Sequence, residues 1–201
     1  MKLERVSAAV IVAASLASAA EAADSGGEFL ARLLGGTLPR QGESFACFVR
    51  QYDNAHLAAH PDQRVTFAKA LVAAYFRKAP FAGGRGAYSY QVSLAFRFRG
   101  DPDTLTQVAE CGDKDSLRFG AECAGPGAKG MHLALEGDQS ILMTIPGGAD
   151  LWAPGPIDKR HDTVKNPFGA DDATFRLDRT DVSECEDLAF DRQKPLRPHE
   201  P

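Results

Sequence analysis

The clearest pattern in the chain is an alternation of apolar and polar positions between residues 87 and 100. On one side of an extended chain this alternation places Tyr88, Tyr90, Val92, Leu94, Phe96 and Phe98. The other side carries mostly Ser, Gln and Arg. Successive side chains of a β-strand point to opposite faces, so a period of two predicts a strand with one buried face.

Shorter segments of the same character follow this strand. They cover residues 104–111, 116–123, 131–136, 140–146 and 173–182, and Gly, Asp or Pro residues separate them. Strands of this length that alternate with turns indicate an antiparallel meander. We therefore predict a mainly β fold, with α+β as the alternative class, in which about six to eight strands curl toward a barrel.

Residues 44–60 show a helical period instead. Apolar and aromatic side chains recur there at intervals of three and four, namely Phe45, Phe48, Val49, Tyr52, His56 and Leu57. Ser44 is a suitable N-cap, and Pro61 ends the segment because the residue before proline avoids helical dihedrals. We predict one N-terminal helix packed on the sheet. Residues 63–78 fit a helix or a strand, and a strand is favoured because 87–100 then has a hairpin partner.

The N-terminal residues indicate the cellular location of the protein. Residues 1–22 have a short basic start, then an apolar run, then two small-x-small motifs that end at Ala19 and Ala22. This is the layout of a signal peptide. The run is shorter than the ~20 residues of a membrane span, and no second run reaches that length. We predict a soluble, periplasmic or secreted protein without a transmembrane segment.

The remaining chain suits one domain. Residues 23–43 are Gly-rich and predict a flexible or short-helical segment, with the short helix at 27–36. A single β-rich domain is expected over 44–190, and the proline-rich residues 191–201 predict a disordered tail.

Four cysteines in an exported chain predict two disulfides, and the absence of CxxC argues against a redox motif or zinc knuckle. They are Cys47, Cys111, Cys123 and Cys185. A tight hairpin around residues 112–115 would place Cys111 at the turn and Cys123 at the far end of the next strand. We therefore favour Cys111–Cys185 with Cys47–Cys123, because bridged Cα atoms lie within ~7 Å.

Charge and motifs exclude several function classes. The formal net charge is −4 at pH 7, so there is no basic excess for binding nucleic acid. GxSxG is absent, and the GxGxxG match at 125–130 lies between strands and predicts a turn. We assign no catalytic residue and no cofactor, and we favour a non-enzymatic protein.

His56 and His60 lie four residues apart, so on a helix their rings share a face. Zinc would require at least a third ligand, and HExxH is absent. A structural role is the favoured interpretation, with His60 near a helix C-terminus, where a cation is stabilised. The pair stays a weak metal candidate.

The long connection 146–172 contains the only tryptophan of the chain. Trp152, Lys159, Arg160 and His161 form the predicted contact patch, because long loops often carry binding residues. The alternative is that Trp152 only caps one end of the sheet. We predict a binding or inhibitor-like module that acts through this loop and the sheet rim on an envelope protein or small ligand. An unrecognised periplasmic hydrolase and an envelope structural protein are the alternatives.

Three stretches resemble a group of bacterial exported proteins of unknown function. They are YDNAHLAAHPDQRV (52–65), CGDKDSLRFGAEC (111–123) and TFRLDRTDVSEC (174–185). The resemblance spans about residues 45–190 and implies a small disulfide-bonded β-rich domain without an assigned activity. Periplasmic β-barrels that inhibit lysozymes share the size and the disulfides, but their binding motif is absent.

Overall fold

The computed structural model describes residues 26–36, 38, 42–77, 87–112, 120–124, 130–153, 163–189 and 196. The predicted signal peptide, nearly all of the predicted tail, and Lys159, Arg160 and His161 lie outside these residues. The described elements are α1 (Gly26–Leu33), β1 (Glu43–Gln51), α2 (Asn54–Ala59), β2 (Val65–Arg77), β3 (Ala87–Phe98), β4 (Thr104–Gly112), β5 (Gly120–Ala124), β6 (Met131–Glu136), β7 (Ser140–Thr144), β8 (Leu151–Trp152), β9 (Thr163–Val164), β10 (Thr174–Thr180) and the 3-10 helix η2 (Val182–Leu188).

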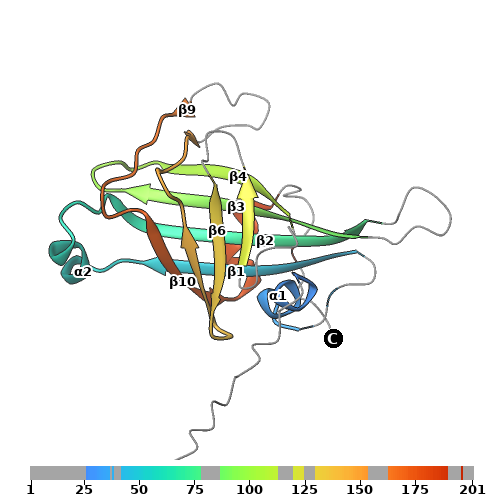
Figure 1. Cartoon of the computed structure of the whole chain (residues 1–201). Helices are drawn as coiled ribbons and strands as arrows, with labels where there is room; N and C mark the ends of the chain where they lie inside the picture. Colours follow the sequence, from blue (N-terminus) through green and yellow to red (C-terminus); the bar gives the residue numbers. More distant parts are fainter. Residues whose placement is uncertain are drawn as a thin grey trace, which may run out of the picture.

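The ten described strands belong to one sheet, and eight of them form a closed ring (Figure 1). The order is β3-β2-β1-β10-β7-β6-β5-β4, and β4 pairs again with β3. All of these pairings are antiparallel, so the predicted meander that curls toward a barrel is confirmed. Strands β8 and β9 form a small hairpin that attaches to β4 through Thr106 and Trp152.

Alternating residues of the ring fill its interior. Partners across the ladder share a face, as Ala68 and Phe96 do between β2 and β3. The largest interior side chains include Phe48, Phe96 and Phe175, each at most 1% exposed. An eight-stranded barrel is just wide enough for such side chains to fill. The ambiguous segment 63–78 is a strand, and it supplies the small residues Ala68, Ala70, Val72 and Ala74 to this core.

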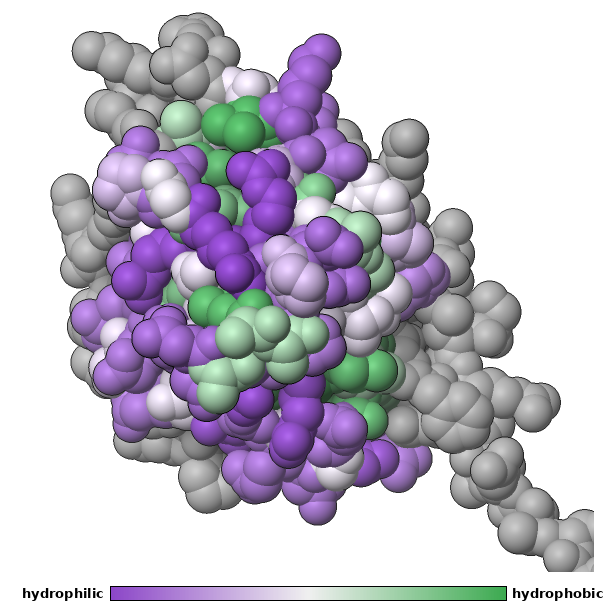
Figure 2. Space-filling model, turned by 90° about the vertical axis from the view of Figure 1, so that its left-hand side faces the viewer, coloured by the Kyte–Doolittle hydropathy of each residue, from purple (hydrophilic) through white to green (hydrophobic). Residues whose placement is uncertain are grey.

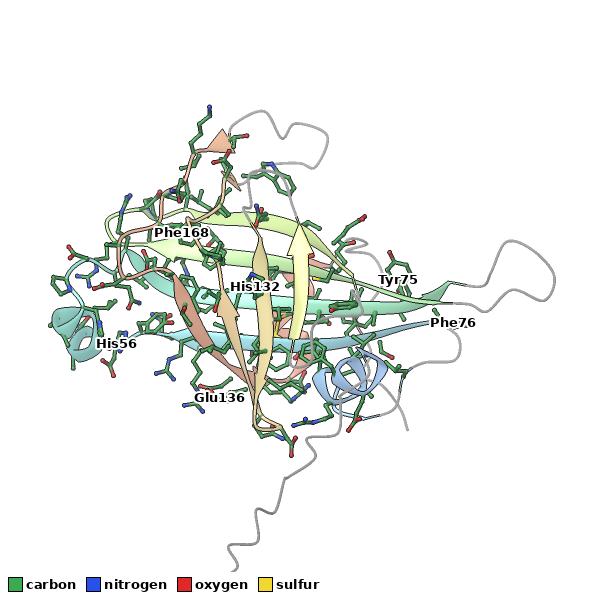
Figure 3. All side chains as sticks on the ribbon, viewed as in Figure 1. His56, Tyr75, Phe76, His132, Glu136 and Phe168 are labelled. Carbon is green, nitrogen blue, oxygen red and sulfur yellow. A yellow bond between two sulfur atoms is a disulfide. The ribbon has the colours of Figure 1, made fainter. Side chains whose placement is uncertain are left out.

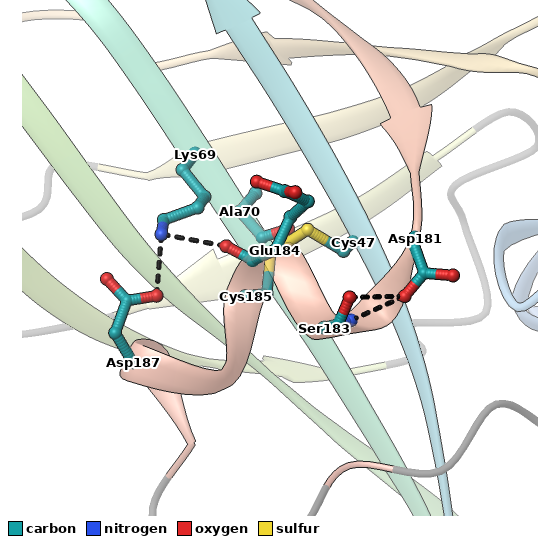
Figure 4. Close-up of a disulfide and its surroundings, with 8 residues drawn as sticks. All are labelled: Cys47, Lys69, Ala70, Asp181, Ser183, Glu184, Cys185 and Asp187. Carbon is teal, nitrogen blue, oxygen red and sulfur yellow. Dashed lines mark hydrogen bonds and ion pairs between the residues drawn. A yellow bond between two sulfur atoms is a disulfide. The ribbon is translucent and has the colours of Figure 1, made fainter.

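One part of the outer face carries a second apolar cluster. Helix η2 crosses β1, β2 and β3, and a disulfide joins Cys185 of η2 to Cys47 of β1 (Figure 4). Lys69 donates to the carbonyl oxygen of Glu184 and pairs with Asp187. The Asp181 carboxylate starts the helix, and hydrogen bonds from Ser183 lower the pKa of that carboxyl.

The favoured disulfide pairing is wrong. Cys47 is bonded to Cys185, with their Cα atoms 5.8 Å apart. Cys111 is also disulfide-bonded, and its backbone lies directly opposite Cys123 in the β4–β5 ladder. Strand β5 begins only at Gly120, so the two strands are not joined by the tight hairpin that the prediction assumed.

The predicted helix over 44–60 is also wrong. Residues 43–51 form strand β1, and only residues 54–59 are helical. Phe48 faces the interior, whereas Cys47 and Val49 belong to the cluster beneath η2. Because both faces of β1 are covered, its apolar residues do not alternate, and their spacing imitates a helix.

The short helix predicted at 27–36 is confirmed, and α1 packs on the barrel. Phe29, Leu30 and Leu33 are buried in the interior cluster. Arg179 of β10 donates to the carbonyl oxygens of Arg32 and Leu33 and lies 4.7 Å from the ring centre of Phe48. Burial lowers the pKa of this guanidinium, and Asp138 acts in the opposite direction. No helix of the described residues is long and apolar enough to span a membrane.

Candidate binding site at the α2 end

Helix α2 connects β1 to β2 and is held at both of its termini. Asp53 is the N-cap and accepts a hydrogen bond from the His56 amide at 2.7 Å. Arg99, just after β3, donates to the carbonyl oxygens of Leu57 and His60. Such a short helix depends on these contacts, because isolated helices shorter than ~12 residues are marginal in water.

Four side chains form a stack that runs from the sheet along α2. The Arg50 guanidinium lies 5.6 Å from the ring centre of Tyr52. The ring of Tyr52 stacks on that of His56 at 4.7 Å, and His56 stacks on His60 at 4.5 Å. At the sheet end of this stack, Arg50 pairs with Asp178 at 3.2 Å.

A glutamine fixes the tautomer of the central imidazole. Gln63 is 5% exposed, and its amide nitrogen donates to the carbonyl oxygen of Val65. Its oxygen therefore faces the His56 Nε2 atom, 2.9 Å away, as an acceptor. Neutral imidazole carries one proton, so His56 bears it on Nε2 and leaves Nδ1 as an acceptor.

Tyr52 is 8% exposed at the position where β1 leaves the sheet. Burial raises the pKa of its hydroxyl, Arg50 lowers it, and the carboxylates of Asp172 and Asp178 add to the increase. No hydrogen bond joins this hydroxyl to another residue of the described part of the chain.

Asp172 ties the end of the long loop to the start of β2. Its carboxylate is 1% exposed and accepts hydrogen bonds from the amides of Arg64, Val65 and Gly169. Gly169 is required here, because an added Cβ would lie 2.0 Å from the carbonyl oxygen of Asp62. Phe168 then packs edge-on against Phe96, with ring centres 5.1 Å apart.

The geometry does not favour the metal interpretation of His56 and His60. Imidazole lone pairs lie in the ring plane, so two stacked rings direct them side by side and not toward one point. Asp171 lies 4.0 Å from the Nδ1 atom of His60. The described residues contain no group of three or more ligating side chains that could hold a metal ion.

Of the four residues in the predicted contact patch of the loop, the structure describes only Trp152. Trp152 lies half-buried on β8, paired with Thr163 of β9. Its three predicted neighbours lie outside the described residues. The end of the same loop reaches α2, and Figure 3 shows His56 and Phe168 on that side, with Tyr75 and Phe76 on the opposite side.

The surface on the α2 side is mainly hydrophilic, with small apolar patches (Figure 2). Among the described residues, the exposed large apolar side chains are Val164 on β9 and Leu142 on β7, each 37% exposed. Comparisons with protein-family models, with curated proteins and with solved structures gave no match to the chain.

Proposed function

We propose that the protein is an exported, non-enzymatic binding module. Its contact surface would be the rim formed by α2 and by the described residues of the loop, 146–153 and 163–172. We name this surface the α2 rim. The observation that carries the proposal is the Arg50–Tyr52–His56–His60 stack, which runs from the buried Tyr52 ring to the exposed His60 ring beside the end of a long loop. Aromatic and arginine residues are enriched where proteins bind one another.

The disulfide supports the exported location, because such bonds persist mainly in oxidising compartments. A periplasmic or secreted protein of this kind would meet envelope proteins or small ligands. Membership of the group of exported proteins that the sequence resembles is part of the same proposal, since the β-rich, disulfide-bonded domain agrees with it.

Site-specific photocrosslinking tests the proposal. A photoreactive phenylalanine would replace Val164 or Ala59 on the α2 rim, and Leu142 on the outer face of β7 as the control. Val164 and Leu142 are matched, because both are 37% exposed. In envelope extract, the rim positions should give an adduct of one defined mass that the control does not give. Equal labelling at all three positions, or no adduct at the rim, would contradict the proposal.

A further inference from the structure

The two ends of the side-chain stack are different. At the sheet end, the stack finishes with a guanidinium, because Arg50 lies over Tyr52 and its NH1 atom is 3.2 Å from Asp178. The order from the sheet outward is therefore carboxylate, guanidinium, phenol and imidazole. The rings of Tyr52, His56 and His60 stack on one another, the guanidinium lies over the Tyr52 ring, and the carboxylate pairs with the guanidinium.

At the solvent end, the stack finishes with an imidazole. The side chain of His60 is 49% exposed, and among the described residues only the His56 ring stacks on it. Asp171 is 39% exposed and lies 4.0 Å from the His60 Nδ1 atom. A carboxylate is present at this end as at the other, but among the described residues no guanidinium lies between it and the outer ring.

We propose that an arginine side chain of a partner protein binds the outer end of the stack. Its guanidinium lies on the exposed face of His60 and pairs with Asp171, which repeats the arrangement of Arg50 between Tyr52 and Asp178. This assignment rests on the proposed function, because it identifies the partner group at the α2 rim.

Arginine fits this position better than lysine does. The guanidinium is planar, stacks on aromatic rings and pairs with a carboxylate, whereas the ammonium of lysine is a hydrated point charge. This protein uses the same contact elsewhere: Arg97 lies 4.2 Å from the ring centre of Phe67, and Arg179 lies 4.7 Å from that of Phe48.

Protonation of His60 opposes this contact. A neutral imidazole offers its π face to a cation, but an imidazolium repels the cation and pairs with Asp171 itself. The groups in contact with the His60 side chain are the His56 ring in the stack and Asp171 from the loop, and Arg99 donates to the His60 carbonyl oxygen. The arginine contact therefore requires the neutral form of His60.

The test is an NMR titration of the full mature chain with three blocked tripeptides, Gly-X-Gly, in which X is arginine, lysine or citrulline. The arginine peptide should give saturable shifts of the amide signals of α2 and Asp171 at pH 8. Citrulline keeps the shape but lacks the charge, so its affinity should be about tenfold lower. Lysine should be intermediate.

Two variants locate the contact. Asp171→Asn and His60→Ala should each weaken arginine binding several-fold, while Asp138→Asn, an exposed carboxylate near α1, should not change it. Unchanged amide signals of the barrel strands show that each variant is folded. Equal shifts with arginine and citrulline, or unchanged binding in Asp171→Asn, would overturn the assignment. Adducts at the rim without arginine binding would leave the proposed function intact and refute only the arginine contact.

Discussion

Helices α1 and α2 lie at opposite ends of β10 and cover the barrel in different ways (Figure 1). Of the side chains of α1, Phe29, Leu30 and Leu33 are at most 4% exposed. In α2, only Leu57 is buried, and the surrounding contacts are made by Gln63, Asp172 and the ring stack. The α1 end is thus covered by apolar packing, and the α2 end by polar contacts that are specific in direction.

This difference between the two ends suggests that the α1 end serves mainly stability and the α2 end mainly recognition. Apolar packing is indifferent to orientation and contributes to stability in proportion to the buried area. Polar and ring contacts contribute less to stability, but they place chemically distinct groups at defined positions on the surface. In both helices an arginine donates to carbonyl oxygens near the C-terminus, but Arg179 at α1 is half-buried and Arg99 at α2 is exposed.

The largest effect is expected in the apolar cover. Leu33→Ala should lower the free energy of unfolding by about 3 kcal/mol, because Leu33 is fully buried and leaves a cavity. The matched change Leu57→Ala should cost about half as much, since α2 can collapse onto the space. Urea denaturation followed by fluorescence measures both. Equal losses would show that the two ends are packed alike.

The next effect concerns the buried carboxylate of the α2 end. Asp172→Ala should cost about 2–3 kcal/mol, because three backbone amides lose their acceptor. Asp171→Ala, the adjacent and exposed carboxylate, should change stability by less than about 0.5 kcal/mol. Hydrogen exchange should show faster opening around residues 63–65 in the first variant only. If both variants were equally stable, Asp172 would not tie the loop to β2.

The two capping arginines provide a smaller comparison. Arg179→Ala should cost about 1–2 kcal/mol through the lost carbonyl contacts and the lost packing on Phe48. Arg99→Ala should cost about 1 kcal/mol at most, with faster amide exchange confined to α2. A larger loss of stability for Arg99→Ala than for Arg179→Ala would contradict the view that the α1 end contributes more to stability than the α2 end.

The smallest effect is expected at the buried phenol. Tyr52→Phe should leave stability at pH 7 within about 0.5 kcal/mol, since the hydroxyl has no partner among the described residues. The raised pKa of Tyr52 means that the unfolded chain loses this proton first as the pH increases. Wild-type stability should therefore fall above about pH 10, and the variant should fall less. Denaturation curves at about pH 8 and about pH 10.5 would test this, and parallel losses would refute it.

Much of the ring could be predicted because most of its strands have one covered face. In β3, one set of alternate residues fills the core, and between Ser89 and Arg97 the other set is polar except for Ala95 beneath η2, so the period of two stays visible in the sequence. The pattern failed in β1, where η2 covers the second face. That cover comes from residues 182–188, far away along the chain, and no local pattern in residues 44–51 contains it.

The disulfide prediction failed for a different reason. It treated β4 and β5 as a tight hairpin, in which the strand ends alternate strictly. The register places Cys111 opposite Cys123, and a shift of that kind depends on the length of the connection between the strands. Strand boundaries are the least certain part of a sequence-based prediction, and disulfide geometry depends on them directly.

At the candidate site, the spacing of four between His56 and His60 correctly placed two rings together. The same interval of four also separates Tyr52 from His56, so the stack of three rings could have been predicted from the sequence. Gln63, Asp171 and Asp172 could not be found in this way, because the turn after α2 and the end of the long loop meet only in the folded ring.

The pairing of β1 with β10 has a consequence for the order of assembly. These strands meet over only three residue pairs, Cys47–Val49 with Asp178–Thr180, and the disulfide between residues 138 positions apart lies beside them. Synthesis begins at the N-terminus, so β1 can pair with β2 early, but it can pair with β10 only after most of the chain has been made. The bond between Cys47 and Cys185 can form only after that, because Cys185 follows β10 in the sequence. The covalent bond therefore joins the first strand of the ring to the helix that follows its last strand.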